Sequence, residues 1–268
     1  IFVLQYQVNL PLSVIFNRAN MKEYEKLFFF FWKLKRLEFT NDHDIWRKFM
    51  TQSHMQRGEF DRLRPYVHRA LLFNQQIIHF VSTIHNYITL EVLETHTKKL
   101  KNKLKAVTNL DDLIKHHNDF VQSVIEQSLL NEDNQIVYKT ILQVFDVVFR
   151  YKMAIDVLNT TLLENYINSR KNIRNREMNE DTNEVFNEQE NLYREQNIRF
   201  SEEAFNQIKT LFEEYKVQIS ELIKTLEVVG KGNFKNLAMK LDYNGYYSDM
   251  ETRMMHNQYY NDDDNNNN

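Results

Sequence analysis

Histidine and acidic side chains are the residues of this chain that could hold a metal ion. A di-iron helical bundle needs Glu and His at i, i+3 on two helices, and no Glu-x-x-His or His-Glu-x-x-His occurs among the nine histidines. The nearest pair is Asp112 and His116 at i, i+4, beside a predicted helix start. A single pair of this kind is more often solvated or locally hydrogen-bonded than a ligand set. We therefore expect no metal ion.

Glycine and serine are equally poorly placed for phosphate binding or nucleophilic catalysis. The close glycine pair Gly230-Lys231-Gly232 lacks the Gly-x-x-x-x-Gly-Lys-Ser/Thr spacing and follows a predicted helix, so it is better read as a helix end and hinge. No strained strand-to-helix turn presents a serine. The chain has no Cys, which excludes a thiol nucleophile and a thiolate metal site. We expect no enzymatic activity and no cofactor.

A basic run is the first of three stretches that could bind another protein. It consists of Lys98, Lys99, Lys101, Lys103 and Lys105. On a helix, Lys98, Lys101 and Lys105 share one face. The run is either a solvated helix end that complements the helix dipole or a docking site for an acidic partner. Nucleic acid is a weaker alternative, since no interleaved aromatic residues could stack on bases.

The other two stretches are aromatic. Residues 28–32 read Phe-Phe-Phe-Phe-Trp and cover a whole helical turn with bulky side chains, which indicates either a surrounded central helix or an interface. Near the end of the chain, Tyr243, Tyr246 and Tyr247 flank Asn244-Gly245, where we expect a left-handed turn to end a short helix. These tyrosines either face a partner or pack the turn back onto the bundle.

The elements that carry these residues are predicted from a shortage of helix breakers. Four Gly and two Pro occur in 268 residues, where average usage of the two is ~12%. Such a chain lacks the turns of a sandwich, barrel or Rossmann fold. We predict an all-α protein, an elongated bundle of long helices with a short extended N-terminal segment. The net charge of −3 and the absence of a long apolar run favour neither nucleic acid nor membrane as a partner.

Local patterns place the helices. Gln5 to Leu12 is expected to be extended, with a helical turn at Ser13 to Phe16. Asn20 and Glu23 resemble a capping box for a helix from Met21 to about Met50. A long helix is expected from Tyr66 to Leu104, and another from an Asn109 cap, with Asp111 and Asp112 in its first turn, through Leu130.

Two later stretches repeat apolar residues at steps of four and three, which predicts narrow seams buried between long helices. The first seam is Val137, Ile141, Val144, Val148, Tyr151, Ile155, Leu158 and Leu162. The second is Phe205, Ile208, Phe212, Tyr215, Ile219, Leu222, Leu226 and Val229. Residues 170–199 between them are polar, and we predict a partly disordered insertion there. Residues 251–268 form an Asn/Asp-rich tail.

Three stretches in series resemble the gamma-tubulin complex protein family, also called the spindle pole body component family, in its C-terminal domain. The first contains Tyr6-Gln-Val-Asn-Leu-Pro11-Leu12, Tyr24-x-x-Leu27-Phe28-x-Phe30, Leu34-Lys35-Arg36 and Trp46, with Leu10 where the family usually has Trp. The second runs from Arg69 through Tyr87 and Val92-Leu93 to Leu110-Asp111-Asp112-Leu113-Ile114-x-x-His117-x-x-Phe120. The third is Leu241-Asp242-Tyr243-Asn244-Gly245-Tyr246-Tyr247.

The resemblance implies that residues 1–250 are a helical domain that binds gamma-tubulin, as part of a longer protein whose absent N-terminal half mediates lateral assembly with other gamma-tubulin complex proteins. It implies a role in microtubule nucleation, in the cytoplasm, at a microtubule-organising centre such as a spindle pole body or centrosome. Because tubulin-family proteins are acidic, our contact candidates combine basic and tyrosine side chains. They are Lys35, Arg36, Lys240, Tyr243, Asn244, Tyr246 and Tyr247. The alternative is a structural tether whose seams pair with another coiled coil.

Overall fold

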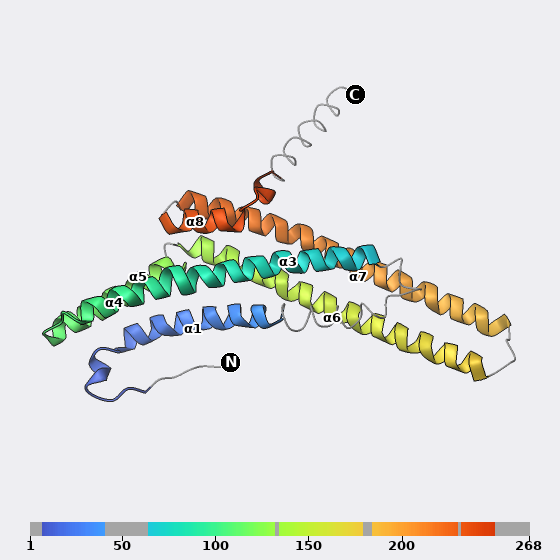
Figure 1. Ribbon diagram of the computed structural model, residues 1–268, viewed down its shortest axis with the longest axis horizontal. Coiled ribbons are helices and arrows are strands. Elements are labelled where there is room, and N and C mark those ends of the chain that lie inside the picture. The colour runs from blue at the N-terminus through green and yellow to red at the C-terminus, as the bar shows by residue number, and fades with distance from the viewer. Residues whose placement is uncertain (1–6, 41–63, 132–133, 179–183, 230–231, 250–268) are drawn as a thin grey trace, which may run out of the picture. The chain divides into compact units, whose positions relative to one another are not determined.

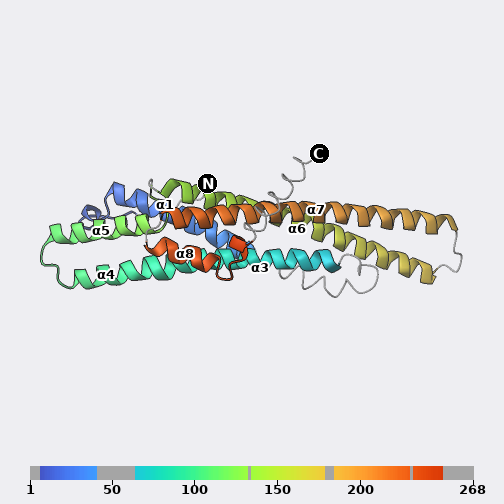
Figure 2. The same cartoon turned by 90° about the horizontal axis from the view of Figure 1, so that it is seen from above.

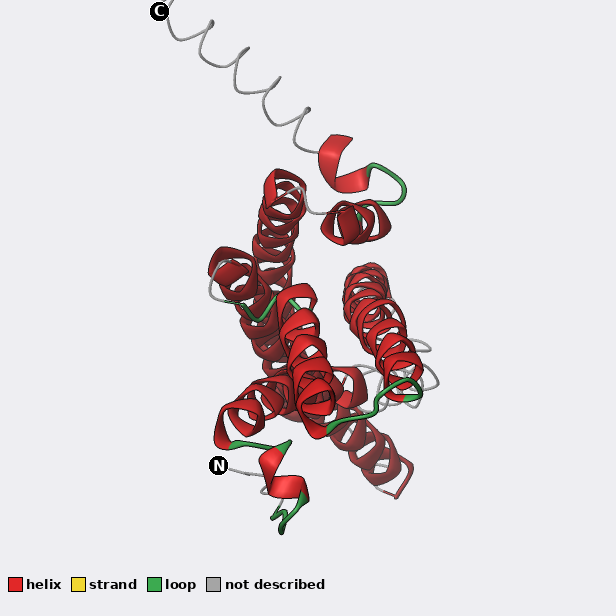
Figure 3. Cartoon of the chain, turned by 90° about the vertical axis from the view of Figure 1, so that its left-hand side faces the viewer, coloured by secondary structure: helices red, strands yellow, loops and turns green. Residues whose placement is uncertain are grey.

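The computed structural model describes residues 7–40, 64–131, 134–178, 184–229 and 232–249, and those ranges contain helices and no strand (Figures 1 and 3). The predicted all-α bundle is therefore confirmed. The elements are η1 (Leu12–Val14), α1 (Arg18–Phe39), α3 (Arg64–Asn86), η4 (Tyr87–Glu94), α4 (Thr95–Leu104), α5 (Leu110–Gln127), α6 (Gln135–Met178), α7 (Glu184–Val229) and α8 (Gly232–Leu241). No helix within the described ranges is both long and apolar enough to cross a membrane.

The chain consists of two compact units. Unit 1 comprises Ile1–Arg36, His79–Gln143 and Gln218–Asn268, and unit 2 comprises Leu37–Ile78 and Val144–Val217. Helices α1, α3, α6 and α7 each contribute residues to both units.

The long helix predicted from Tyr66 to Leu104 is confirmed, and it is formed by α3, η4 and α4 in succession. It begins at Arg64, with Pro65 in its first turn, where a missing backbone N–H costs nothing. The middle segment, η4, has π-helical hydrogen bonding. The predicted apolar positions are all buried: Val67, Ala70, Ile77, Val81, Ile84, Ile88 and Val92.

The Asn109 cap of α5 is also confirmed. The Asn109 side chain accepts a hydrogen bond from the backbone N–H of Asp112 at 2.8 Å, and both predicted aspartates lie in the first turn. The helix ends at Gln127 rather than at Leu130. It stops there because Leu129 adopts a left-handed φ of 65°, which a continuing helix does not permit.

The predicted cap of α1 is wrong. The helix begins at Arg18, and the side chain of Asn17 accepts the backbone N–H of Asn20 at 2.9 Å. Asn20 lies inside the first turn and is buried, with its amide turned towards α5. The short helical turn before α1 is found at Leu12–Val14. The expected helix end near Met50 and the break at Gly58 lie outside the described residues.

Of the two interpretations of residues 28–32, the one in which α1 is surrounded on all sides is wrong, and the interface stays a prediction. Only one stripe of the helix is buried, formed by Leu27, Phe30, Leu34 and Leu37. On the opposite side Trp32 is 52% exposed, and its ring stacks with that of Phe28 at a centroid distance of 6.2 Å. An aromatic run around the whole helix is therefore compatible with one-sided packing, because neighbouring rings on the outer side cover one another.

Both predicted seams are buried. The buried residues of the α6 seam are Val137, Ile141, Val144, Val148, Tyr151, Ile155 and Leu158. The side chain of Leu162 lies outside the described residues. On α7, Phe212 and Val229 are half-buried and the other six positions are buried. The backbone of residues 170–178 and 184–199 is helical, and residues 179–183 and the tail lie outside the description. Disorder in this insertion stays a prediction.

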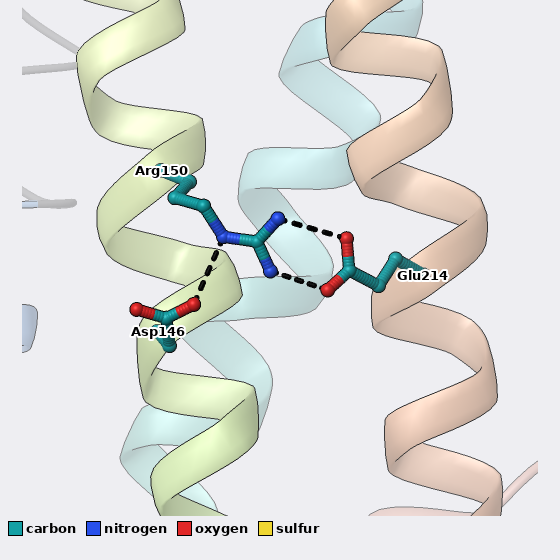
Figure 4. A network of polar contacts seen from close by, with 3 residues as sticks. All are labelled: Asp146, Arg150 and Glu214. Carbon is teal, nitrogen blue, oxygen red and sulfur yellow. Dashed lines mark hydrogen bonds and ion pairs between the residues drawn. The ribbon is translucent and has the colours of Figure 1, made fainter.

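Within unit 2, an ion-pair network joins α6 to α7 on the exposed side (Figure 4). Arg150 donates from Nε to Asp146 at 2.9 Å and from both terminal nitrogens to the Glu214 carboxylate, one of these at 3.0 Å. The hydrogen bonds to Glu214 raise the pKa of Arg150. Because the side chain is 43% exposed, water screens the network, and it contributes little to stability.

Candidate protein-binding surface

Helix α8 presents a buried face and an exposed face, as its apolar periodicity requires. The buried face consists of Phe234, Leu237, Ala238 and Leu241. On the exposed face, Met239 is 56% exposed and Lys240 is also in solvent. Figure 2 shows α8 beside the long helix formed by α3, η4 and α4, and the ion pair of Lys240 with Glu91 joins α8 to η4. One side of α8 is therefore open to a partner.

The turn after α8 adopts the predicted left-handed conformation at Gly245, with φ of 65°. Its shape is fixed by the Asp242 carboxylate, which accepts the backbone N–H of Tyr247 at 3.0 Å and that of Ser248 at 3.1 Å. The Ser248 hydroxyl donates to the same carboxylate at 2.5 Å. The Asp242 side chain thus holds the backbone of residues 247 and 248. Residues 243–246, which lie between, are therefore positioned before any partner binds.

The three tyrosines of this turn differ in burial. Tyr243 is 86% exposed and Tyr246 is 45% exposed, whereas only 8% of Tyr247 is exposed. The rings of Tyr246 and Tyr247 meet edge to face, with centroids 5.1 Å apart. Both sequence-based alternatives therefore apply, to different residues: Tyr247 packs the turn onto the helices and supports Tyr246 from behind.

Lys240 forms an ion pair with Glu91 of η4, so the exposed face of α8 is tied to the long helix beneath it. Four residues before Glu91, the buried Tyr87 hydroxyl donates to the backbone carbonyl of Gln127 at 2.9 Å. Burial, with a smaller contribution from the Glu91 carboxylate, raises the pKa of Tyr87. The Gln127 side chain in turn accepts from Asn233 at 3.1 Å. These contacts fix where α8 begins and ends on unit 1.

The contact candidates fall into two separate groups. Lys240, Tyr243, Asn244, Tyr246 and Tyr247 come together at the end of α8, and all but Tyr247 are exposed. Lys35 and Arg36 are exposed on α1, and Figures 1 and 3 show α1 and α8 on opposite sides of unit 1.

Sequence reasoning missed a hydrogen-bonded cluster between α1 and α5 in unit 1. His117 lies 2.9 Å from the Tyr24 hydroxyl through Nε2 and 3.4 Å from the Asn20 amide nitrogen through Nδ1. The same amide nitrogen donates to Asn118 at 2.8 Å, and Phe16 meets the imidazole edge to face at 5.0 Å. The same nitrogen also donates to the Ile15 carbonyl at 3.1 Å, and because it can only donate, its place beside Nδ1 favours neutral His117 over the doubly protonated form.

Burial lowers the pKa of His117, in keeping with this neutral form. No local sequence pattern predicts the cluster, because its members come from segments that are more than ninety residues apart. It brings the first stretch of the family resemblance into contact with the second. No group of three or more His, Asp or Glu that could hold a metal ion occurs among the described residues.

Comparison with known proteins shows the family. The chain matches the family described as "Gamma tubulin complex component C-terminal" over residues 1–247, and it belongs to that family. It is 24% identical to "Gamma-tubulin complex component 3" of Arabidopsis thaliana over 261 residues, covering 94% of this chain and 31% of the relative. It is 28% identical to "Spindle pole body component 98" of Dictyostelium discoideum over 255 residues, covering 93% and 28%.

A third relative, the "Gamma-tubulin complex component 3 homolog" of Xenopus laevis, is 30% identical over 164 residues, which is 61% of this chain and 18% of that protein. The chain thus spans less than a third of the length of each of these relatives. The family resemblance predicted from three stretches of sequence is confirmed.

Proposed function

We propose that this domain binds gamma-tubulin and supports microtubule nucleation as one part of a gamma-tubulin complex, without catalysing a reaction. The observation that carries the proposal is the family match over residues 1–247. The relatives named as gamma-tubulin complex and spindle pole body components support placing the protein at a microtubule-organising centre, assembled with other proteins of the family.

We propose the end of α8 as a contact surface for gamma-tubulin. Met239, Tyr243 and Tyr246 expose apolar surface there, beside the positive charge of Lys240. Tyrosine buries a large rigid area at low entropic cost and keeps a polar tip, which is why it is enriched at binding hot spots. The basic residues Lys35 and Arg36 on α1 form a second, separate candidate contact.

Co-elution with purified tubulins tests the function directly. The 268-residue chain is mixed with gamma-tubulin, or with alpha/beta-tubulin dimer, and each mixture is passed over a sizing column. We expect the chain to co-elute with gamma-tubulin at micromolar concentration and to retain alpha/beta-tubulin less. A folded chain that retains no gamma-tubulin contradicts the proposal.

The tyrosines provide a test of the surface. Tyr243→Ala and Tyr246→Ala are expected to weaken gamma-tubulin binding about tenfold each, as hot-spot truncations do, with the melting temperature nearly unchanged. Tyr247→Ala is expected to lower the free energy of unfolding by about 2–4 kcal/mol, because it leaves a cavity. Binding measured beside thermal unfolding separates the two effects. If Tyr243→Ala and Tyr246→Ala bind like the parent chain, the end of α8 is not the contact.

A further inference from the structure

The tip of the helical hairpin formed by α4 and α5 is strongly basic. Between residues 98 and 115 the chain carries six Lys and two Asp, although the whole chain has a net charge of −3. The two helices lie side by side in unit 1 and are joined by residues 105–109 (Figure 2). His96 is buried, whereas residues 101–106 are exposed. The positive charge is therefore concentrated in solvent, at one end of the hairpin.

Few of these lysines are neutralised within the chain. Lys98 pairs with Glu94 at 2.7 Å, and Lys103 lies 4.0 Å from Asp119 of α5. Lys99, Lys101 and Lys105 have no acidic partner among the described residues. Helical spacing places Lys98, Lys101 and Lys105 on one outer face. Like charges on one face repel one another, and an anionic partner would remove that cost.

Two exposed leucines accompany the lysines at the tip. Leu104, the last residue of α4, is 38% exposed, and Leu110, the first residue of α5, is 54% exposed. These two side chains add apolar surface beside the lysines. Cationic and apolar groups side by side suit a ligand that carries carboxylates together with apolar side chains.

We infer that the tip of the α4–α5 hairpin is a docking site for an acidic protein segment that contains apolar residues. Lys101 and Lys105 pair with its carboxylates, Lys98 exchanges its ion pair with Glu94 for one of them, and Leu104 and Leu110 contact its apolar side chains. A protein segment fits better than nucleic acid, because residues 95–115 contain no Phe, Tyr or Trp on which bases could stack. An anionic membrane is the other ligand to which a lysine cluster binds, and phosphatidylserine vesicles test it below.

A labelled peptide tests this site without reference to gamma-tubulin. The probe is a fluorescein-labelled peptide of repeating Glu-Glu-Leu, and its matched control repeats Gln-Gln-Leu. We expect the full chain to bind the acidic probe in a fluorescence anisotropy titration and to bind the neutral control at least tenfold more weakly. Raising the salt concentration is expected to weaken binding of the acidic probe.

Charge-matched variants locate the site. The triple variant Lys98→Gln, Lys101→Gln, Lys105→Gln is expected to bind the acidic probe at least tenfold more weakly. The control triple variant Lys139→Gln, Lys209→Gln, Lys235→Gln loses the same charge at exposed positions elsewhere and is expected to bind it like the parent chain. Circular dichroism verifies that both variants are helical. Leu104→Ser with Leu110→Ser is expected to weaken binding severalfold while leaving its salt dependence intact.

Three outcomes would overturn the inference: equal binding of the acidic and neutral probes, equal loss in both triple variants, or a hairpin variant that loses binding only to phosphatidylserine vesicles or single-stranded DNA. Any of these leaves the co-elution test of gamma-tubulin binding unaffected, because the probe contains no tubulin.

Discussion

At the scale of single residues, side chains of one type differ in burial and in hydrogen-bond partners within unit 1. Tyr243 and Tyr247 belong to one tyrosine-rich turn, yet 86% of the first and 8% of the second are exposed. Asn17 and Asn20 both suit a helix cap, yet Asn17 caps α1 and Asn20 bonds to α5. Burial and hydrogen-bond partners therefore decide which residue binds a partner and which holds the domain together.

His117 makes the stability of unit 1 depend on pH. Burial lowers its pKa in the folded state from the ordinary 6.5, so the unfolded chain takes up this proton more readily. The stability that neutral His117 provides is complete above about pH 6.5 and declines as the pH falls towards the lowered value. Protonation would also place an N–H against the Asn20 amide nitrogen, which cannot accept it.

We expect urea denaturation to show a loss of free energy of unfolding between pH 7 and pH 5. His117→Gln keeps a polar side chain beside Tyr24 but does not titrate, so this variant is expected to lose less free energy of unfolding over the same pH range. Parallel pH profiles for the parent chain and the variant would contradict the assignment.

At the scale of elements, α3 is held in unit 2 by tyrosines from its two neighbours. The Tyr151 hydroxyl of α6 donates to the backbone carbonyl of Ala70 at 2.8 Å, and the Tyr215 hydroxyl of α7 donates to that of Gln76 at 3.1 Å. Phe73 lies between the two tyrosine rings, with centroids 4.5 Å and 5.2 Å away. Both carbonyls belong to the backbone of α3. Each tyrosine therefore fixes the position of α3 along the helix that carries the tyrosine.

Tyr151→Phe tests this arrangement. The substitution keeps the ring and removes one buried hydrogen bond, so we expect the free energy of unfolding to fall by about 1 kcal/mol. Chemical denaturation followed by circular dichroism measures the change. Tyr243→Phe, at an exposed position, serves as the control and is expected to have no effect. An unchanged Tyr151→Phe variant would show that the hydroxyl contributes nothing to the packing of α3.

At the scale of the whole molecule, the buried seams bear on the alternative of a coiled-coil tether. That hypothesis requires an apolar stripe left open for another helix. The seam of α6 is buried at all seven described positions, and on α7 Tyr215, Ile219, Leu222 and Leu226 are covered as well. The seams are therefore satisfied within one chain, which favours a domain that binds its partner through other surfaces.

We expect the isolated chain to be monomeric for the same reason. Sedimentation velocity over a hundredfold range of concentration should give one species with the mass of a single 32.6 kDa chain. A concentration-dependent shift to a dimer would favour the tether hypothesis. Comparing the parent chain with Trp32→Gln would then show whether the exposed aromatic side of α1 is responsible.

The features that the sequence alone determined are local. Helix type follows from the shortage of Gly and Pro, the seams from steps of three and four, the α5 cap from Asn109, and the last turn from the tolerance of Gly245 for positive φ. Each depends on a residue and its near neighbours along the chain. The family resemblance was predictable too, because it lies in the order of short motifs.

Only the tertiary structure decided which of these residues face solvent and which face one another. The bonds of Asn20 and Tyr24 to His117, the ion pair of Lys240 with Glu91, and the burial of Tyr247 all join or cover residues from distant segments. Periodicity shows that a helix has an apolar face, but it leaves open which element covers that face. The packing of all helices together decides which element covers it, because each buried face needs a complementary face.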